Sequence, residues 1–221
     1  MSNKINSKKE QGFSMVELAI VLAIIALIVG AVAVGKDLQR NAEYRKIANK
    51  FIGQWAQAYN QYYERTGVVI GDSFDTPTGK VKQADVTLMG GSTLSNEMIR
   101  FGIRLPQGQG RGTGETSSAR ATEYRYLDQS GVPHLLTLSF VYNGTANSTT
   151  YNNLVGNLMF LTNVTPKLGS TTDALIDGVV EYNGGYFRGS KDWSSQKSAG
   201  ATQASEESAE EDLTAVWKMN Q

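Results

Sequence analysis

The chain has 221 residues, of which 40% are hydrophobic and 19% charged, which predicts one globular domain plus a membrane anchor rather than a disordered chain. The formal net charge is zero, so the molecule as a whole has no field that attracts nucleic acid. The absence of cysteine excludes thiol catalysis, zinc–thiolate sites and disulfides, and the single histidine, His134, excludes a multi-histidine metal site.

An apolar run over residues 13–34 dominates the N-terminal part of the chain. Apart from Ser14 and Glu17 its residues are apolar or glycine, and it is long enough for a membrane-spanning helix, which needs about 20 residues. Basic residues precede the run, so we expect residues 1–12 to stay in the cytoplasm and residues 13–35 to form the transmembrane half of a longer helix.

A single-pass membrane anchor and a secretory signal peptide both share these features, but neither explains Glu17. A plain single-pass anchor accounts for the length and the basic flank. A secretory signal peptide accounts for the basic start, with a small-residue cleavage site at Ala31-Val32-Ala33, although its apolar region is usually only about 7–15 residues long. Neither accounts for Glu17, because a carboxylate in an apolar helix is costly in free energy and usually functional.

The heptapeptide GFSMVEL, which starts at Gly12, resembles the processing site of type IV prepilins and pseudopilins. The resemblance rests on the glycine, the phenylalanine, the glutamate and the apolar helix together, and it covers residues 11–40. It implies that a prepilin peptidase cuts after Gly12 and methylates the new amine of Phe13. Residues 1–12 are then a cleaved leader, and Phe13 and Glu17 act in assembly.

The same resemblance implies a structural subunit with neither catalytic activity nor a cofactor. Its expected partners are other copies or related pilin subunits, bound through the N-terminal helix, together with the peptidase and an inner-membrane assembly platform. Its expected location is the bacterial inner membrane as a single-pass protein with an extracytoplasmic domain, and then a cell-surface or periplasmic filament. Because Glu17 lies one helical turn beyond Phe13, its carboxylate can meet a neighbouring subunit's Phe13 amine and fix the register between subunits.

One position departs from the family pattern. Many pilins carry a proline near position 34 that lets the helix melt in the filament, whereas this chain has Val34 between Gly30 and Gly35. Glycine loosens a helix without forcing a break, so melting at this point does not follow from the sequence.

The helical pattern continues beyond the apolar run, which predicts one helix over residues 13–65 with a C-cap at Gly67. Its second half has one apolar stripe and a polar opposite face, as expected for a helix that packs on a sheet. The stripe consists of Tyr44, Ile47, Phe51, Trp55, Ala58, Tyr59 and Tyr62. Aromatic residues at this spacing indicate core packing rather than electron transport.

Residues 66–221 are expected to form a β-rich globular domain, which gives an α+β fold with the long helix packed on a small antiparallel sheet, as in pilins. The clearest signal is a hairpin of Glu123–Leu127 and His134–Tyr142. Further strands are predicted at Leu158–Thr162, in a second hairpin of Val179–Tyr182 and Tyr186-Phe187, and at Leu213–Met219, which is expected to be an edge strand or a short helix. Loops are expected in three segments: from Val69 to about residue 90, over 107–114 and over 190–212.

Two groups of acidic residues are weak candidates for calcium binding. Asp72 and Asp75 share one loop, and Asp173, Asp177 and Glu181 cluster later in the chain. Major pseudopilins of type II secretion have a calcium loop near the C-terminus, but neither group here has a complete ligand spacing. Turn-forming aspartates are the simpler interpretation.

Three enzyme or ligand motifs are incomplete. Gly71-Asp72-Ser73 resembles the nucleophile block of one esterase class, but Gly131 stands where that class needs an aspartate three residues before His134. The stretch from Gly30 to Asp37 lacks the hydroxyl residue of a phosphate-binding loop. No basic cluster with interleaved aromatic residues indicates nucleic-acid binding, so no nucleic acid is expected as a partner.

The sequence therefore favours a subunit of a type IV pilus-like filament. A pseudopilin of type II secretion shares all of these features. A DNA-uptake component shares the processing site but requires a basic surface patch. The alternative from another class is a secreted or single-pass anchored extracytoplasmic binding protein, in which Glu17 has no role.

Overall fold

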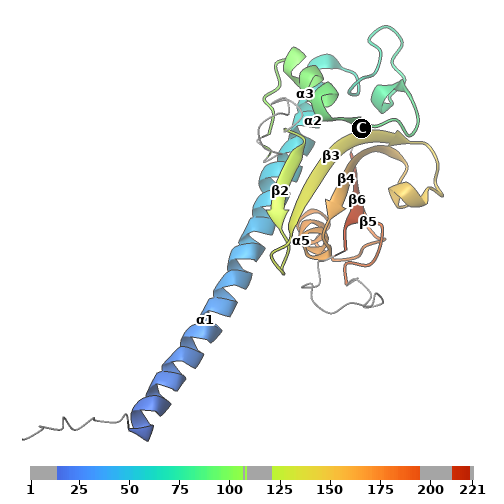
Figure 1. Ribbon diagram of the computed structural model, residues 1–221. Helices are drawn as coiled ribbons and strands as arrows, with labels where there is room; N and C mark the ends of the chain where they lie inside the picture. Colours follow the sequence, from blue (N-terminus) through green and yellow to red (C-terminus); the bar gives the residue numbers. More distant parts are fainter. Residues whose placement is uncertain (1–13, 107, 109–120, 195–210, 220–221) are drawn as a thin grey trace, which may run out of the picture. The chain divides into compact units, whose positions relative to one another are not determined.

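The computed structural model describes residues 14–106, 108, 121–194 and 211–219. The chain divides into two compact units, Met1–Gln39 and Arg40–Gln221. The described part of the first unit consists of helix α1 (Met15–Ile47), whose last residues belong to the second unit (Figure 1). α1 is long and apolar enough to cross a membrane, and its large apolar side chains up to Leu38 are exposed, including Leu22, Leu27 and Val29.

In the second unit the helical chain passes through a π-helical turn, η1 (Ala48–Ile52), into α2 (Gly53–Thr66). α2 ends where the sequence predicts. Gly67 has the left-handed φ of 75°, and its N–H donates to the carbonyl oxygen of Tyr63 at 2.7 Å. Glycine adopts this conformation without steric cost, which closes the last helical turn.

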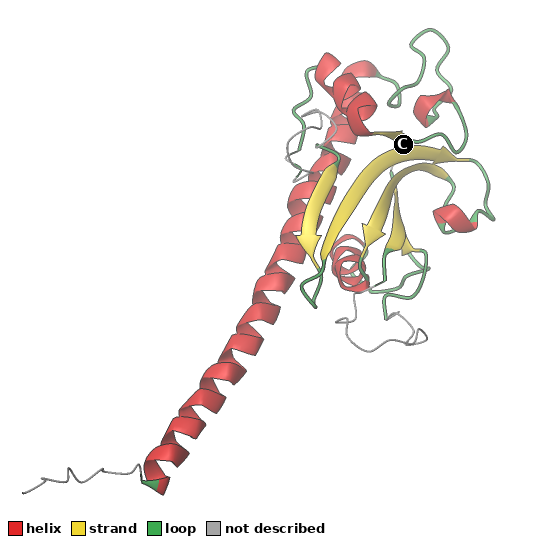
Figure 2. Ribbon diagram, in the orientation of Figure 1, coloured by secondary structure: helices red, strands yellow, loops and turns green. Residues whose placement is uncertain are grey.

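The second unit contains one antiparallel sheet, shown in Figure 2. Its strand order is β1-β3-β4-β6-β5, and β2 also pairs with β3, along the same edge of β3 as β1. Its strands are β1 (Met89–Gly90), β2 (Glu123–Leu127), β3 (Pro133–Asn143), β4 (Gly156–Val164), β5 (Phe187–Gly189) and β6 (Leu213–Lys218). Two helices, α3 (Gly91–Arg100) and α5 (Pro166–Ile176), complete the domain with the short 3₁₀ turns η2 (Val81–Gln83) and η3 (Thr149–Tyr151). The α+β fold and the β2–β3 hairpin are confirmed.

The core lies between the aromatic stripe of the helix and one face of the sheet. Trp55 is fully buried and donates its indole N–H to the carbonyl oxygen of Ala121 at 3.0 Å. Tyr59 stacks on Phe140 of β3 with 4.8 Å between ring centroids. The stripe is therefore core packing, because stacked and hydrogen-bonded rings fix the helix on the sheet.

The second predicted hairpin is wrong. Val179 and Val180 form no strand and are exposed, and β5 pairs with β6 instead. The preceding segment is helix α5, and a carboxylate within it and one at its C-cap bind the following turns. Asp173 accepts from the N–H of Glu181, and the C-cap residue Asp177 accepts from the N–H of Phe187, both at 2.8 Å. These local bonds compete with strand pairing.

One further expectation needs correction, and one helix was not predicted. The C-terminal segment is a strand, not a helix, and it is not an edge strand, because β6 lies between β4 and β5. The loop-rich region predicted up to residue 90 contains only the short turn η2 and, at its end, β1, whereas α3, which follows it, was not predicted. The expected loops over 107–114 and 190–212 fall largely outside the described residues.

His134 begins β3, as expected, but it is not an ordinary strand residue. Its side chain is buried, its Nδ1 lies 2.7 Å from Oδ1 of Asp212, and its Nε2 lies 3.2 Å from Oδ2 of Asp128. Asp128 is fully buried in the β2–β3 turn, and its carbonyl oxygen accepts from the guanidinium of Arg40. His134 therefore ties the helix-side turn to the start of β6.

Replacing His134 with alanine should destabilise the domain by about 3 kcal/mol, because it leaves the buried Asp128 carboxylate without the ring nitrogen that it contacts. The matched control is Asp212→Asn, which removes the half-exposed partner and should cost less than about 1 kcal/mol. Thermal unfolding followed by circular dichroism measures both variants. Equal effects of the two substitutions would contradict the role assigned to the buried pair.

Candidate functional site

The described chain begins at the functional segment, with a reciprocal pair of hydrogen bonds at the start of α1. The N–H of Ser14 donates to Oε2 of Glu17 at 2.9 Å, and the N–H of Glu17 donates to Oγ of Ser14 at 3.2 Å. This is a capping box, which satisfies two backbone donors of a helix terminus. Gly12 and Phe13 lie outside the described residues.

The capping box gives Glu17 a partner within its own chain. The carboxylate is exposed and sits at the positive end of the α1 macrodipole, which stabilises its negative charge. Its Oε2 reaches back to the N–H of Ser14, the residue that precedes the helix. The S-x-x-E pattern of Ser14 and Glu17 is visible in the sequence, and the sequence analysis missed it.

The apolar side chains of α1 up to Gln39 have no cover within their own unit. Leu27 is 75% exposed and Leu22 65% exposed. Aliphatic side chains in water cost about 1.5–3 kcal/mol each relative to a buried position, so this surface requires lipid or other helices. Glu17 lies within this apolar surface, one turn from its beginning.

The first calcium candidate is used for loop structure. Asp72 is buried, and its two carboxylate oxygens accept from the N–H groups of Ser73, Thr78 and Gly79 and from Oγ1 of Thr78, at 2.7 to 3.1 Å. Burial acts to raise the pKa of Asp72, but these hydrogen bonds outweigh it and hold the pKa below its usual value. Asp75 of the same loop is exposed.

The second candidate group is also engaged. Asp173 is buried, and its Oδ2 accepts from the indole N–H of Trp193 at 2.9 Å and from the N–H of Glu181. Burial raises the pKa of Asp173, and the nearby Asp177 and Glu181 carboxylates add to the rise. Within the residues that the structure describes, no group of three acidic or histidine side chains is arranged to hold a metal ion. Calcium binding stays a prediction without a preformed site.

The incomplete esterase motif is not completed in space. Both ring nitrogens of His134 face Asp128 and Asp212, so neither is directed at Ser73. A general base must lie within hydrogen-bond reach of the nucleophile it activates.

Asp72→Ala should destabilise the domain by about 3 kcal/mol, because each hydrogen bond to a charged acceptor contributes roughly 1.5–3 kcal/mol and the loop loses its common acceptor. Since the folded pKa of Asp72 is lowered, its contribution is fully present above the unfolded value, about 3.9, and is lost as pH falls through the folded pKa. Thermal unfolding between pH 7 and pH 3 should therefore show a shallower acid dependence for this variant.

The control for this experiment is Asp75→Ala, an exposed change in the same loop, which should shift Tm by little. The unsubstituted protein and the Asp75→Ala variant are also heated with added calcium and with a chelator. A ligand that binds only the folded state raises Tm, so a calcium-dependent rise that Asp75→Ala abolishes would establish the metal site and contradict the purely structural role of Asp72.

The comparisons with known proteins single out the same segment as the geometry does. Residues 7–33 match the family described as the prokaryotic N-terminal methylation motif. No curated protein and no solved structure matches the chain. The match includes Gly12, Phe13 and Glu17, and it continues into the exposed apolar helix. The chain therefore carries the type IV prepilin and pseudopilin signal on a long N-terminal apolar helix that leads into an α+β, pilin-like domain.

Proposed function

We propose that this chain is the precursor of a structural subunit of a type IV pilus-like filament. The observation that carries the proposal is the continuity between the methylation motif at residues 7–33 and a helix whose apolar side chains are exposed. In the proposed pathway the helix enters the bacterial inner membrane as a single span, with the domain outside the cytoplasm. A prepilin peptidase then cuts between Gly12 and Phe13 and methylates the Phe13 amine.

Assembly exchanges lipid for protein around the same apolar surface. In the membrane, the α1 side chains up to Gln39 contact acyl chains. In the filament they contact the equivalent helices of other copies or of related subunits, which the inner-membrane assembly platform brings together. Packing between lipid-exposed helices has little hydrophobic driving force of its own, so a polar contact is needed to select the alignment.

We assign that contact to Glu17 and the amine of Phe13 from a neighbouring subunit. An unpaired charge in a low-dielectric environment is strongly unfavourable, so the helices align where the two charges meet. In the isolated chain the carboxylate bonds to Ser14 instead. Assembly thus replaces an internal bond to a neutral backbone donor by a bond to the cationic amine of another subunit, in which both partners are charged.

Subunits of a pilus and of a type II secretion pseudopilus share this pathway, and the proposal covers both. A secreted or single-pass anchored binding protein does not share it. Such a protein starts either at Met1 or near Val34, and its Glu17 has no role in assembly.

The N-terminal peptide of the protein purified from its native membrane separates these possibilities. Mass spectrometry should find a peptide that starts at N-methylated Phe13. An intact Met1 start, or a start at Val34, would exclude filament assembly by this route and return the chain to the anchored or secreted class.

Glu17→Ala should be processed at Phe13 but should assemble poorly, with a loss of about tenfold or more in sheared filament, because the helices lose the contact that sets their register. Glu17→Gln should behave similarly, since the amide keeps the shape and lacks the charge. The control is Glu64→Ala, an exposed change on α2. Filament yields at wild-type level for Glu17→Ala would show that the register mechanism is wrong.

A further inference from the structure

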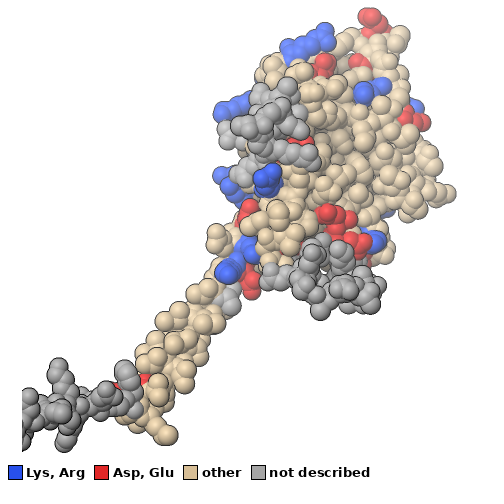
Figure 3. Space-filling view, in the orientation of Figure 1, with Lys and Arg blue, Asp and Glu red and all other residues tan. Residues whose placement is uncertain are grey.

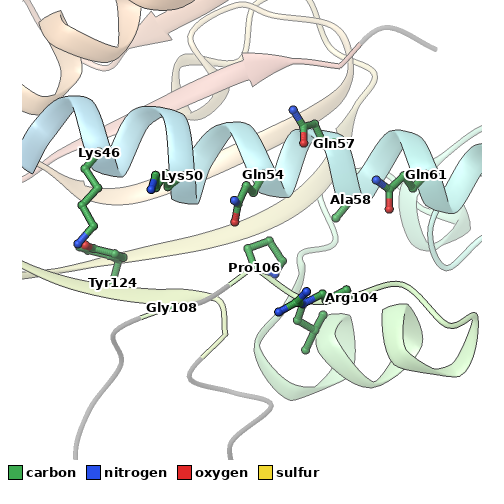
Figure 4. Close-up of a pocket in the computed structure, with 11 residues that line it drawn as sticks. Lys46, Lys50, Gln54, Gln57, Ala58, Gln61, Arg104, Pro106, Gly108 and Tyr124 are labelled. Carbon is green, nitrogen blue, oxygen red and sulfur yellow. The ribbon is translucent and has the colours of Figure 1, made fainter.

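A groove of about 660 Å³ runs along the helix of the second unit, between the helix and the segment that follows α3 (Figure 4). Its helix side is a polar stripe at three- and four-residue steps, formed by Lys46, Lys50, Gln54, Gln57 and Gln61. Arg104 faces the stripe from the opposite wall. From Lys46 to Gln61 the stripe is about 22 Å long at 1.5 Å per residue.

The π-helical turn lies within this stripe. η1 contains Lys50, and a π turn places one extra residue in the helix, so the residues after it are rotated back relative to a continuous α-helix. The rotation compensates the drift that residues at four-residue steps otherwise show, and it keeps Lys46, Lys50 and Gln54 on one line. Single π turns of this kind are frequent at functional sites.

The groove carries positive charge that is not neutralised nearby. Lys46, Lys50 and Arg104 are exposed, and none of them forms an ion pair with the described part of the chain, where the lysine and arginine pairs are Lys80–Asp85, Arg100–Glu97 and Lys191–Glu211. In Figure 3 basic side chains predominate along the helix edge of the domain, and acidic side chains gather over the region of α5 and β5. The groove is thus suited to an anionic partner.

The features of the groove favour an acidic peptide over a nucleic acid. Single-stranded nucleic acids need exposed aromatic rings on which bases stack. The aromatic ring of the groove, Tyr124, is only 4% exposed and packs on Phe51 with 5.3 Å between centroids. The three glutamines offer amide donors and acceptors, which pair with peptide groups and hydroxyls.

The same chain contains a segment of the complementary chemistry. Five of the seven residues from 206 to 212 are acidic, in a chain whose net charge is zero. Glu211 and Asp212 bind Lys191 and His134 of their own domain, and Glu206, Glu207 and Glu210 carry the remaining charges of the run. Residues 206–210 span at most about 18 Å when extended, which fits the length of the groove.

We propose that the groove binds the acidic segment 206–210 of a second copy, and so forms a contact between the globular domains of neighbouring subunits. This contact rests on the proposed filament function and supplies what the N-terminal helices do not, a specific alignment of the domains. Exposed ion pairs are individually weak and screened by salt. The contact contributes because every subunit repeats it, and it weakens as ionic strength rises.

Cross-linking tests the contact directly, because the chain has no cysteine and each introduced thiol is unique. Lys50→Cys and Glu207→Cys are expressed as two separate chains in the same cell, so that any mixed disulfide joins two copies. The matched control replaces Lys50→Cys with Glu64→Cys, an exposed position that does not line the groove. Oxidation should give at least about tenfold more mixed dimer with Lys50→Cys than with Glu64→Cys, because complementary charges bring the acidic segment of one copy to the groove of the other.

Equal dimer yields from the two pairs overturn the proposal. A chain that carries both Lys50→Cys and Glu207→Cys is the second control. If it forms its disulfide within one chain, and the separate chains form none, the segment occupies its own groove and the contact between copies is also overturned.

A charge swap measures the effect on assembly. The triple variant Lys46→Glu/Lys50→Glu/Arg104→Glu, with exposed changes only, should reduce sheared filament by about tenfold while processing at Phe13 and Tm stay unchanged. Glu206→Lys/Glu207→Lys/Glu210→Lys should do the same, and the two sets together should restore assembly.

The unmodified chain distinguishes a failure of the proposed function from a failure of the groove contact. If it is not processed at Phe13 or forms no filament, the proposed function fails. If it assembles but the combined charge swap does not recover filament yield, only the groove contact is overturned.

Discussion

The constraint on which the molecule depends is an apolar helix surface that the chain itself does not cover. The exposed aliphatic side chains between Met15 and Leu38 represent on the order of 20 kcal/mol of unrealised burial. No soluble domain tolerates such a surface, so the first unit must always be in lipid or among other helices. In the proposed function, the rest of the chain is a domain carried by a helix that exchanges lipid for other helices without contacting water.

The helix meets two different demands in succession, and its sequence changes accordingly. From Leu18 to Gly35 it is apolar or glycine on all sides and makes no distinction between neighbours. From Tyr44 onward it has one aromatic stripe, which the sheet buries through Trp55 and Tyr59, and one polar stripe, which stays open. The π turn at η1 lies where both stripes must be kept in line, since the core and the groove use adjacent faces of the same turns.

Features that depend on local pattern were predictable, and features that depend on long-range partners were not. The helix end at Gly67 and the β2–β3 hairpin follow from periodicity and turn chemistry within a few residues. The place of β6 inside the sheet depends on its pairing with β4 and β5. One bond of His134 depends on Asp212, which is 78 residues away in the sequence. The failed hairpin at Val179 shows the reverse case, because the carboxylates of Asp173 and Asp177 capture the backbone groups that a strand needs. At the N-terminal segment the sequence predicted Phe13 and Glu17 as a pair, whereas the bond between Glu17 and Ser14 was recognised only from the structure, although the sequence contains its S-x-x-E pattern.

The bond between Glu17 and Ser14 lowers the free energy that the proposed contact with a neighbouring Phe13 amine contributes to assembly. A carboxylate with no partner at the membrane would gain the full strength of its first charge pair, and any cation would satisfy it. A carboxylate already held by Ser14 gains only the difference between two bonded states, so a weak or misplaced cation does not displace the cap. In the proposed filament, the capping box therefore makes the contact with a neighbouring amine more selective at some cost in affinity. Such a difference of affinities suits a filament in which one wrong register would be copied by every later subunit.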